Sequence, residues 1–168
     1  MLVQYIAEYL EYLQAERGLA QNTIDAYRRD LSAFCDFLCN SEAIDNFENI
    51  KRLHINCYIK DLHDNNYSST SVTRKIAAIR GWFRWLTASE IITQDTSLGV
   101  ELPKLVKKLP KVMTVSEIER ILSANLTVTE KVVMELLYGA GLRVSELAEL
   151  ELNNIELSSK YIRCIGKG

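Results

Sequence analysis

A glycine-flanked arginine near the C-terminal end is the residue of this sequence best suited to chemistry. Arg143 follows Gly139 and Gly141 within the apolar segment 136–147. The glycines are expected to end a buried helix abruptly, so that Arg143 projects from a tight turn with apolar support on both sides. A guanidinium held in this way can donate two parallel hydrogen bonds to a phosphate. Glu146 is near enough to orient the arginine, although the spacing also fits a purely structural pair.

A second basic group lies in a helix that the sequence predicts from Thr70 to Thr87. Residues 69–87 include no acidic residue and four basic ones, Arg74, Lys75, Arg80 and Arg84. Hydroxyl side chains crowd the start of the helix, at Ser69, Thr70, Ser71 and Thr73. Free N–H groups, hydroxyls and nearby cations together can bind a phosphate. Tyr27, Arg28 and Arg29 form a smaller basic group earlier in the chain. The alternative is that all of these are ordinary solvated charges on a helical bundle.

Composition allows a folded chain of one or two small domains, because 48% of the 168 residues are hydrophobic. The formal net charge of -2 gives no general attraction to nucleic acid. Acidic residues, however, gather in the first helix and in residues 42–48, which leaves one face basic. A segregated charge pattern of this kind can bind DNA despite an acidic total, through phosphate contacts that salt weakens.

The cysteines and histidines indicate neither disulfides nor a metal site. The four cysteines, Cys35, Cys39, Cys57 and Cys164, show no CxxC spacing. Cys35 and Cys39 lie one helical turn apart in an apolar stripe, which predicts buried thiols. His54 and His63 have no partner at ligand spacing, so no metal is expected. The sequence has no signal peptide or membrane-spanning run, and the expected location is the cytoplasm.

The apolar periodicity predicts a bundle of four helices followed by a different kind of domain. Apolar residues recur at three- and four-residue steps in four segments, approximately 2–13, 22–38, 51–65 and 70–87. In the third segment Leu53, Tyr58, Ile59 and Leu62 are expected to face inward. Residues 95–111 contain Pro103, Pro110 and four lysines (Lys104, Lys107, Lys108 and Lys111), which is typical of an interdomain linker. The expected domains are a helical domain over 1–88, a linker over 89–112 and a second domain over 113–168.

The second domain is expected to begin with a helix whose capping box is Thr114 to Glu117. Further helices are expected over 128–138 and 145–150, followed by a strand over 161–165 that leads into Gly166-Lys167-Gly168. In this arrangement Tyr138 and Tyr161 lie on core elements. The overall expectation is a mainly α chain with a small α+β second part.

The segment Leu-Tyr-x-x-Gly-Leu-Arg-x-Ser-Glu-Leu, residues 137–147, resembles the first arginine motif of the tyrosine recombinases (phage integrase family), especially the Xer-like bacterial group. Residues 22–34 and 71–83 are similar to the second and fourth helices of that family's core-binding domain. Leu102-Pro103-Lys104 and Leu109-Pro110 resemble its linker, and Lys167 stands where the family has its β-hairpin lysine. The resemblance therefore runs in order along the whole chain.

The resemblance implies a four-helix, SAM-like core-binding bundle, a basic linker and a truncated α+β catalytic domain. It implies site-specific DNA recombination through a 3'-phosphotyrosine intermediate, without metal or other cofactor, by a parent protein that is tetrameric on double-stranded DNA. Arg143 and Lys167 would be catalytic, with Glu146 supporting Arg143. The implied DNA-binding residues are Thr23, Tyr27, Arg28, Ser71, Thr73, Arg74, Lys75 and Arg80.

The sequence departs from the family pattern where the resemblance places the remaining catalytic groups. The His-x-x-Arg motif and the nucleophilic tyrosine would follow Gly168, so this chain is expected to bind DNA without cutting it and to be monomeric when free. A naturally short protein that occupies recombination sites is the alternative, which a reading frame ending at codon 168 would favour. A helical interaction module with no nucleic-acid role also remains, and loss of DNA binding on replacing Arg74 and Arg80 would exclude it.

Overall fold

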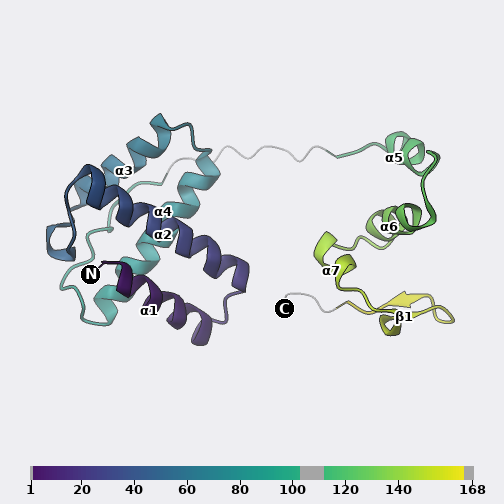
Figure 1. Ribbon diagram of the computed structural model, residues 1–168, viewed down its shortest axis with the longest axis horizontal. Coiled ribbons are helices and arrows are strands. Elements are labelled where there is room, and N and C mark those ends of the chain that lie inside the picture. The colour runs from purple at the N-terminus through teal and green to yellow at the C-terminus, as the bar shows by residue number, and fades with distance from the viewer. Residues whose placement is uncertain (1, 103–111, 165–168) are drawn as a thin grey trace. The chain divides into compact units, whose positions relative to one another are not determined.

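A computed structural model of the protein describes residues 2–102 and 112–164, which fall into two compact units (Figure 1). The first unit spans Met1–Lys107 and the second Lys108–Gly168. Each is described by itself below. The four lysines and two prolines of the expected linker lie outside the described residues.

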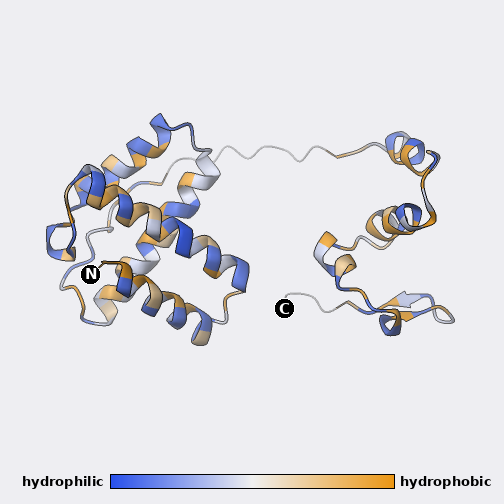
Figure 2. Cartoon of the chain, viewed as in Figure 1, coloured by the Kyte–Doolittle hydropathy of each residue, from blue (hydrophilic) through white to orange (hydrophobic). Residues whose placement is uncertain are grey.

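The first unit is the predicted bundle of four helices. A short 3-10 turn, η1 (Phe47–Asn49), precedes the third helix. The helices are α1 (Leu2–Ala15), α2 (Gln21–Ser41), α3 (Arg52–Asp64) and α4 (Ser69–Ala88). Their apolar faces turn toward one another, so that hydrophobic colour concentrates inside the bundle (Figure 2). Periodicity alone predicted these helices because each buries one continuous apolar stripe.

The core of the first unit is built around α4. Trp82 and Phe83 are at most 1% exposed, and Phe47 meets Trp82 edge to face with ring centroids 5.4 Å apart. The indole N–H of Trp82 donates a hydrogen bond of 3.2 Å to the main-chain oxygen of Tyr5. This bond satisfies the one polar group of the largest buried side chain and joins α4 to α1. Val100 is also buried in this core, so the chain continues to pack on the bundle beyond α4.

Close approach of α1 to α4 depends on a glycine within a helix. Gly81 lies in the middle of α4, and a Cβ at this position would be 2.4 Å from the hydroxyl oxygen of Tyr9 and 3.6 Å from its Cζ. Tyr9 is 3% exposed and packs against Trp85, with 5.6 Å between ring centroids and 43° between the ring planes. Burial raises the pKa of the Tyr9 hydroxyl above its ordinary value. The glycine therefore makes room for a buried phenol.

Over residues 112–164, the second unit contains three helices and a small antiparallel strand pair. Its elements are α5 (Val115–Leu122), α6 (Val128–Gly139), α7 (Val144–Ala148), the 3-10 turn η2 (Leu152–Asn154), β1 (Ile155–Glu156) and β2 (Tyr161–Ile162). Ile155 pairs with Ile162 across the ribbon. The mainly helical fold with a small strand element is thus confirmed. Strand β1 was not predicted, because two residues are too few to show an alternating pattern.

Capping boxes begin the first two helices of this unit. The predicted box at Thr114 is confirmed: its hydroxyl accepts from the N–H of Glu117 at 3.3 Å, and Glu117 accepts from the N–H of Thr114 at 2.7 Å. Thr127 and Glu130 repeat the arrangement at the start of α6. These bonds lower the pKa of both glutamates.

Four side chains predicted to be buried are exposed. Leu53 is 64% exposed because it lies in the first turn of α3, outside the stripe formed by Ile55, Tyr58 and Leu62. Cys39 is exposed near the C-terminal end of α2, whereas Cys35 is buried as predicted. Tyr138 and Tyr161 are 54% and 49% exposed. Both lie in the second unit, where Ile118 alone of the described residues is buried.

No helix among the described residues is both long and apolar enough to cross a bilayer.

Replacing Gly81 by alanine tests the close approach of the two helices. Alanine is about 1 kcal/mol more favourable than glycine inside a helix, but here its Cβ collides with the Tyr9 hydroxyl. We expect Gly81→Ala to lower the free energy of unfolding by about 1–2 kcal/mol. In a Tyr9→Phe background, where 3.6 Å to the ring carbon is ordinary contact, it should be neutral or stabilising. Urea unfolding of the wild type, the two single variants and the double variant measures these free energies. An equal effect of Gly81→Ala in both backgrounds would refute the proposed collision with the Tyr9 hydroxyl.

Candidate nucleic-acid interface and arginine turn

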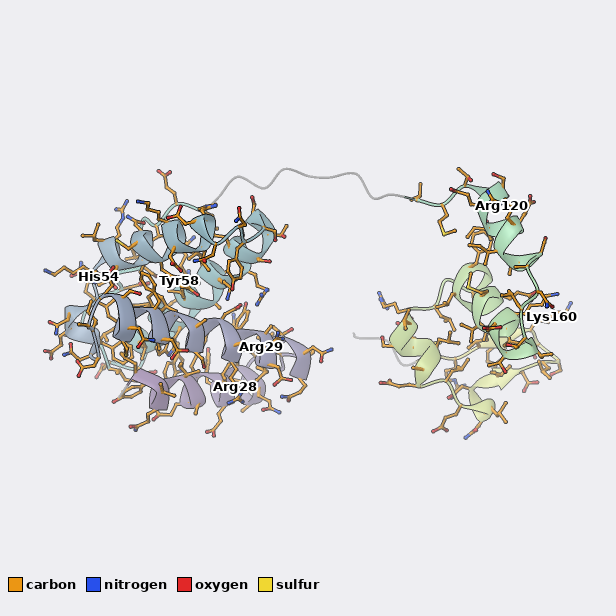
Figure 3. All side chains as sticks on the ribbon, turned by 45° about the horizontal axis from the view of Figure 1, so that its top comes forward. Arg28, Arg29, His54, Tyr58, Arg120 and Lys160 are labelled. Carbon is orange, nitrogen blue, oxygen red and sulfur yellow. The ribbon has the colours of Figure 1, made fainter. Side chains whose placement is uncertain are left out.

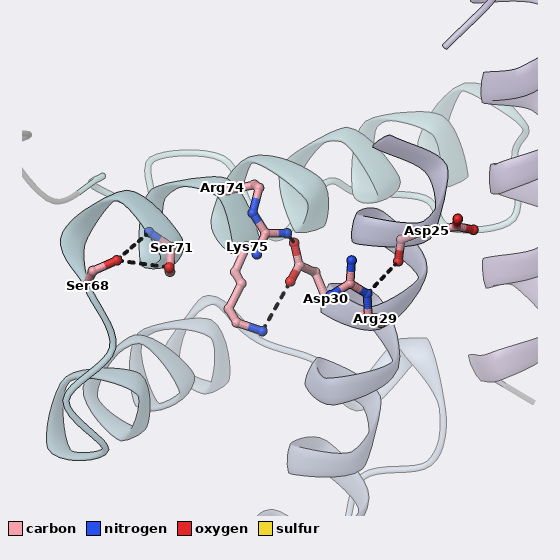
Figure 4. Close-up of polar contacts among 7 residues, drawn as sticks. All are labelled: Asp25, Arg29, Asp30, Ser68, Ser71, Arg74 and Lys75. Carbon is pink, nitrogen blue, oxygen red and sulfur yellow. Dashed lines mark hydrogen bonds and ion pairs between the residues drawn. The ribbon is translucent and has the colours of Figure 1, made fainter. Parts of the chain in front are cut away.

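The start of α4 carries the predicted group of hydroxyls, ordered by a cap. The Ser68 hydroxyl accepts a bond of 3.2 Å from the N–H of Ser71, and the two hydroxyl oxygens are 2.9 Å apart (Figure 4). Ser68 precedes the residues that the sequence singled out, and it fixes where the helix begins. Thr73 is partly buried, and its hydroxyl has no hydrogen-bond partner in the part of the chain that the structure describes.

One face of α4 is basic and open to solvent. The helix buries Val72, Ile76, Ile79 and Phe83 at three- and four-residue steps. Opposite this stripe, the Arg74 side chain is 45% exposed, Arg80 is partly buried and Arg84 is exposed. These three arginines form what we call the basic face of α4. Ala77, also exposed, lies between them, so that only a small side chain covers the helix there.

Asp30 of α2 lies at the crossing with α4 and contacts two cations. It is 2% exposed; one carboxylate oxygen pairs with Nη1 of Arg74, and the other is 3.1 Å from Nζ of Lys75 (Figure 4). Lys75 is itself buried, and its Nζ lies 5.4 Å from the centre of the Tyr67 ring. Arg74 and Lys75 were both predicted to bind DNA, and no functional role was predicted for Asp30.

A clue to Asp30 was present in the sequence. It directly precedes Leu31 and follows Tyr27 by three residues, so helical geometry places it beside the apolar stripe. A carboxylate in that position needs a cation in the folded protein, since an unpaired buried charge is costly. The sequence could not show which of the many basic residues would supply it.

The predicted residues of α2 lie on the same helix as Asp30. Thr23 and Tyr27 are partly buried, and Tyr27 packs against the hydrophobic core. Arg28 and Arg29 are exposed (Figure 3). The Nε of Arg29 donates to the main-chain oxygen of Asp25 at 3.2 Å (Figure 4). Arg28 therefore adds an exposed cation to α2, two residues before Asp30.

Arg143 lies at the end of the turn between α6 and α7, as predicted from the sequence. Gly141 has a φ of +66°, a conformation that glycine adopts without strain. The Arg143 N–H donates to Oε2 of Glu146 at 2.8 Å, and its guanidinium pairs with Oε1 of the same carboxylate. The Arg143 side chain is 75% exposed. The expected apolar support is wrong on one side, where Val144 is 73% exposed, whereas Leu142 on the other side is partly buried.

The Arg143 contacts lower the pKa of Glu146, the main-chain N–H having the largest effect and the guanidinium a smaller one. Glu146 thus contacts the arginine that it was predicted to support. Lys167, the second predicted catalytic residue, lies outside the described residues. Within residues 2–102 and 112–164, no group of three acidic, histidine or cysteine side chains could hold a metal ion.

Comparison with known families divides the chain in the same order. Residues 6–90 match "Phage integrase, N-terminal SAM-like domain", and residues 111–168 match "Phage integrase family". The chain belongs to the phage integrase family. Its tyrosine recombinase relatives include XerD of Halalkalibacterium halodurans, 37% identical over 97% of this chain, and XerC of Roseiflexus castenholzii, 33% identical over 98%. The chain spans 56% and 54% of the lengths of these two proteins.

Solved structures show the same integrase fold. A lambda integrase tetramer bound to a Holliday junction matches with a TM-score of 0.74 at 20% identity, covering 96% of this chain and 46% of that one. A lambda integrase dimer bound to a core site matches with a TM-score of 0.71, also at 20% identity, covering 98% of this chain and 48% of that one. This chain and lambda integrase therefore share a fold although about four aligned residues in five differ.

Titration of Glu146 tests the two contacts of Arg143 separately. A lowered pKa in the folded chain means that the contact favours folding above the ordinary value of 4.5 and is lost as pH falls through the folded value. Arg143→Gln removes the guanidinium but keeps the main-chain N–H. We therefore expect the Glu146 pKa to rise only part of the way toward 4.5 in carboxyl-detected NMR. Glu117, capped by Thr114, is the control. A complete return of the Glu146 pKa to 4.5 in Arg143→Gln would contradict the larger effect assigned to the main-chain N–H.

Proposed function

We propose that this chain is the DNA-binding part, and the beginning of the catalytic domain, of a site-specific tyrosine recombinase. The family matches over residues 6–90 and 111–168 support it, as do relatives that are themselves named tyrosine recombinases. The observation that carries the proposal is the basic face of α4. Its arginines, of which Arg74 and Arg84 are exposed, lie on the bundle of a family whose solved relatives include lambda integrase bound to a core site.

The first unit binds double-stranded DNA. Arg74 and Arg80, with Thr23, Tyr27, Arg28, Ser71 and Thr73, supply cations and hydroxyls that suit phosphate oxygens. Arg84 extends the same face of α4 by one turn beyond Arg80. Contacts of this kind fix the position of a protein on the duplex, and they weaken as counterions compete at higher salt. A DNA partner also fits the cytoplasmic location that the sequence predicts.

The second unit supplies part of a phosphoryl-transfer site. Attack of a tyrosine hydroxyl on a DNA phosphodiester forms a phosphotyrosine bond and breaks the bond to the 5'-oxygen, which leaves with a proton. Arg143 would stabilise the negative charge on the non-bridging oxygens. Lys167 would donate the proton to the 5'-oxygen. Glu146 would hold Arg143 while leaving other guanidinium donors free for phosphate. The parent recombinase would work as a tetramer on DNA.

The 168-residue polypeptide binds DNA without cutting it and is monomeric when free. Its buried tyrosines do not suit attack: burial raises the pKa of both Tyr9 and Tyr58, which opposes formation of the phenolate. Tyr138 and Tyr161 are half exposed, but they belong to α6 and to β2 and not to a segment of the family's nucleophile motif.

Neutralising the basic face should weaken DNA binding. We expect Arg74→Gln/Arg80→Gln to reduce affinity for a duplex by about tenfold or more at low salt. We also expect the slope of log affinity against log salt to fall by about 1.8, since each lost phosphate contact contributes about 0.9. Glutamine is preferable to glutamate, which would place a second carboxylate beside buried Asp30. Fluorescence anisotropy over a series of salt concentrations measures both quantities.

The matched control is Lys51→Gln/Lys60→Gln, which removes two exposed cations from the start and the outer face of α3. It changes net charge by the same amount and should alter affinity far less. The proposal that α4 presents the DNA contacts would be wrong if wild-type affinity did not depend on salt concentration. It would also be wrong if the two double variants lost equal affinity.

The 168-residue chain should form no covalent adduct with a nicked or 5'-phosphorothiolate duplex. The physical reason is that no tyrosine among its residues belongs to the family's nucleophile motif. A denaturing gel detects the adduct, and a recombinase known to form one serves as the positive control. A band of protein joined to DNA would show that one of the eight tyrosines is a competent nucleophile.

A further inference from the structure

We propose that Asp30 is a positioning residue for DNA binding: it holds Arg74 on the basic face of α4 in an orientation ready to contact a phosphate, while Lys75 balances the buried carboxylate. This inference rests on the proposed function and deepens it. Asp30 touches no DNA itself in this proposal, because it is 2% exposed. It acts through the arginine.

The geometry separates the two neighbouring cations into different roles. Arg74 reaches Asp30 with Nη1 while its side chain stays 45% exposed, so the guanidinium spans from the interior to the surface. Lys75 reaches the other carboxylate oxygen at 3.1 Å from inside the bundle, with 9% of its side chain exposed. A phosphate could meet Arg74 without disturbing the cluster. Lys75 offers a phosphate little accessible surface, since only 9% of its side chain is exposed.

An arginine that is paired with a carboxylate keeps donors for a second partner. The guanidinium has five N–H donors, and the bond between Arg74 and Asp30 occupies one nitrogen of three. A free arginine on a helix surface samples many rotamers, which it must give up when it binds a phosphate. Asp30 restricts those rotamers on folding, before DNA arrives. The cost of ordering the side chain then no longer falls on binding.

Because Lys75 also pairs with Asp30, the carboxylate can hold Arg74 without cancelling the positive charge of this cluster. One carboxylate and two cations leave the cluster with a net positive charge, and the exposed member is Arg74. The Tyr67 ring lies 5.4 Å from Nζ of Lys75, which favours a cation at that place. Lys75 thus has a structural role in this proposal, in place of the direct DNA contact that the sequence suggested.

Two opposite expectations make the proposal testable. If Asp30 merely cancels positive charge near DNA, removing its charge should tighten binding. If Asp30 positions Arg74, removing its charge should weaken binding even though the protein becomes more positive. The sign of the change therefore distinguishes positioning from simple electrostatics.

The experiment compares Lys75→Met with Asp30→Asn/Lys75→Met in the full 168-residue chain. Asp30→Asn alone would leave Lys75 buried without its partner and could unfold the bundle. Methionine keeps the length of Lys75 and can pack on the Tyr67 ring. Lys75→Met is the reference protein, because any effect of the lost lysine charge on affinity is common to both variants. The double variant should bind about tenfold more weakly, with a salt slope smaller by about 0.9. Circular dichroism melting verifies that both proteins are folded.

Arg74→Gln completes the test in the two backgrounds that leave no buried charge unpaired. It should weaken binding in the wild-type background, where Lys75 still pairs with Asp30, and have little further effect in Asp30→Asn/Lys75→Met. Asp25→Asn is the matched charge control, because Asp25 lies on the same helix and its carboxylate accepts from Gln21 at 3.0 Å. Arg29 donates to the main-chain oxygen of Asp25 and not to this carboxylate (Figure 4). The Asp25→Asn variant also removes one negative charge and should leave affinity unchanged or slightly higher.

The outcomes separate this proposal from the function on which it rests. If the wild-type chain fails to bind DNA, the proposed function itself is wrong. If the wild type binds and Asp30→Asn/Lys75→Met binds as tightly as Lys75→Met or more tightly, Asp30 does not position Arg74 and the positioning role is overturned. Equal weakening by Asp25→Asn would overturn it too.

Discussion

A carboxylate can remain in the apolar core of this bundle because two cations reach it from a neighbouring helix. Asp30 is 2% exposed, and an unpaired charge at such a site would cost several kcal/mol. Its partners are consecutive residues of α4, Arg74 and Lys75, which point in directions about 100° apart on an ideal helix. Both can meet one carboxylate only where α4 crosses α2 at Asp30. The ion cluster thus fixes the register of these two helices and, with it, which arginines face solvent.

A second arginine–carboxylate pair in the same chain shows how much burial matters. Arg143 and Glu146 are three residues apart, and the arginine is 75% exposed. A pair with an arginine this exposed contributes little to stability, because water already solvates the guanidinium. What they fix is local geometry: Glu146 caps the main-chain N–H of Arg143 and holds its guanidinium at the end of the turn. One pair therefore orders two helices, whereas the other orders a single side chain.

The two units differ in how their apolar residues are used. In the first unit, α4 contributes Trp82 and Phe83 to a dense core, and Gly81 lets Tyr9 approach the helix backbone. In the second unit, helix-compatible apolar residues remain on the surface of the described chain, among them Val128 at 82% and Leu157 at 84% exposure. Local capping by Thr114 and Thr127 begins the helices there without help from a core.

The sequence by itself determined the helices, their order, the capping box at Thr114 and the turn at Gly141, because each depends on residues close together in the chain. It also identified Arg143 and the contact with Glu146, which lie within one helical turn. It could not decide which cations are buried, and Leu53, Tyr138 and Tyr161 are more exposed than pattern alone suggested. Burial of a side chain depends on which distant segment packs against it. Arg74, for example, pairs with Asp30, which lies 44 residues earlier in the chain. Tertiary structure alone decided that one of two adjacent cations faces solvent and the other supports it from within.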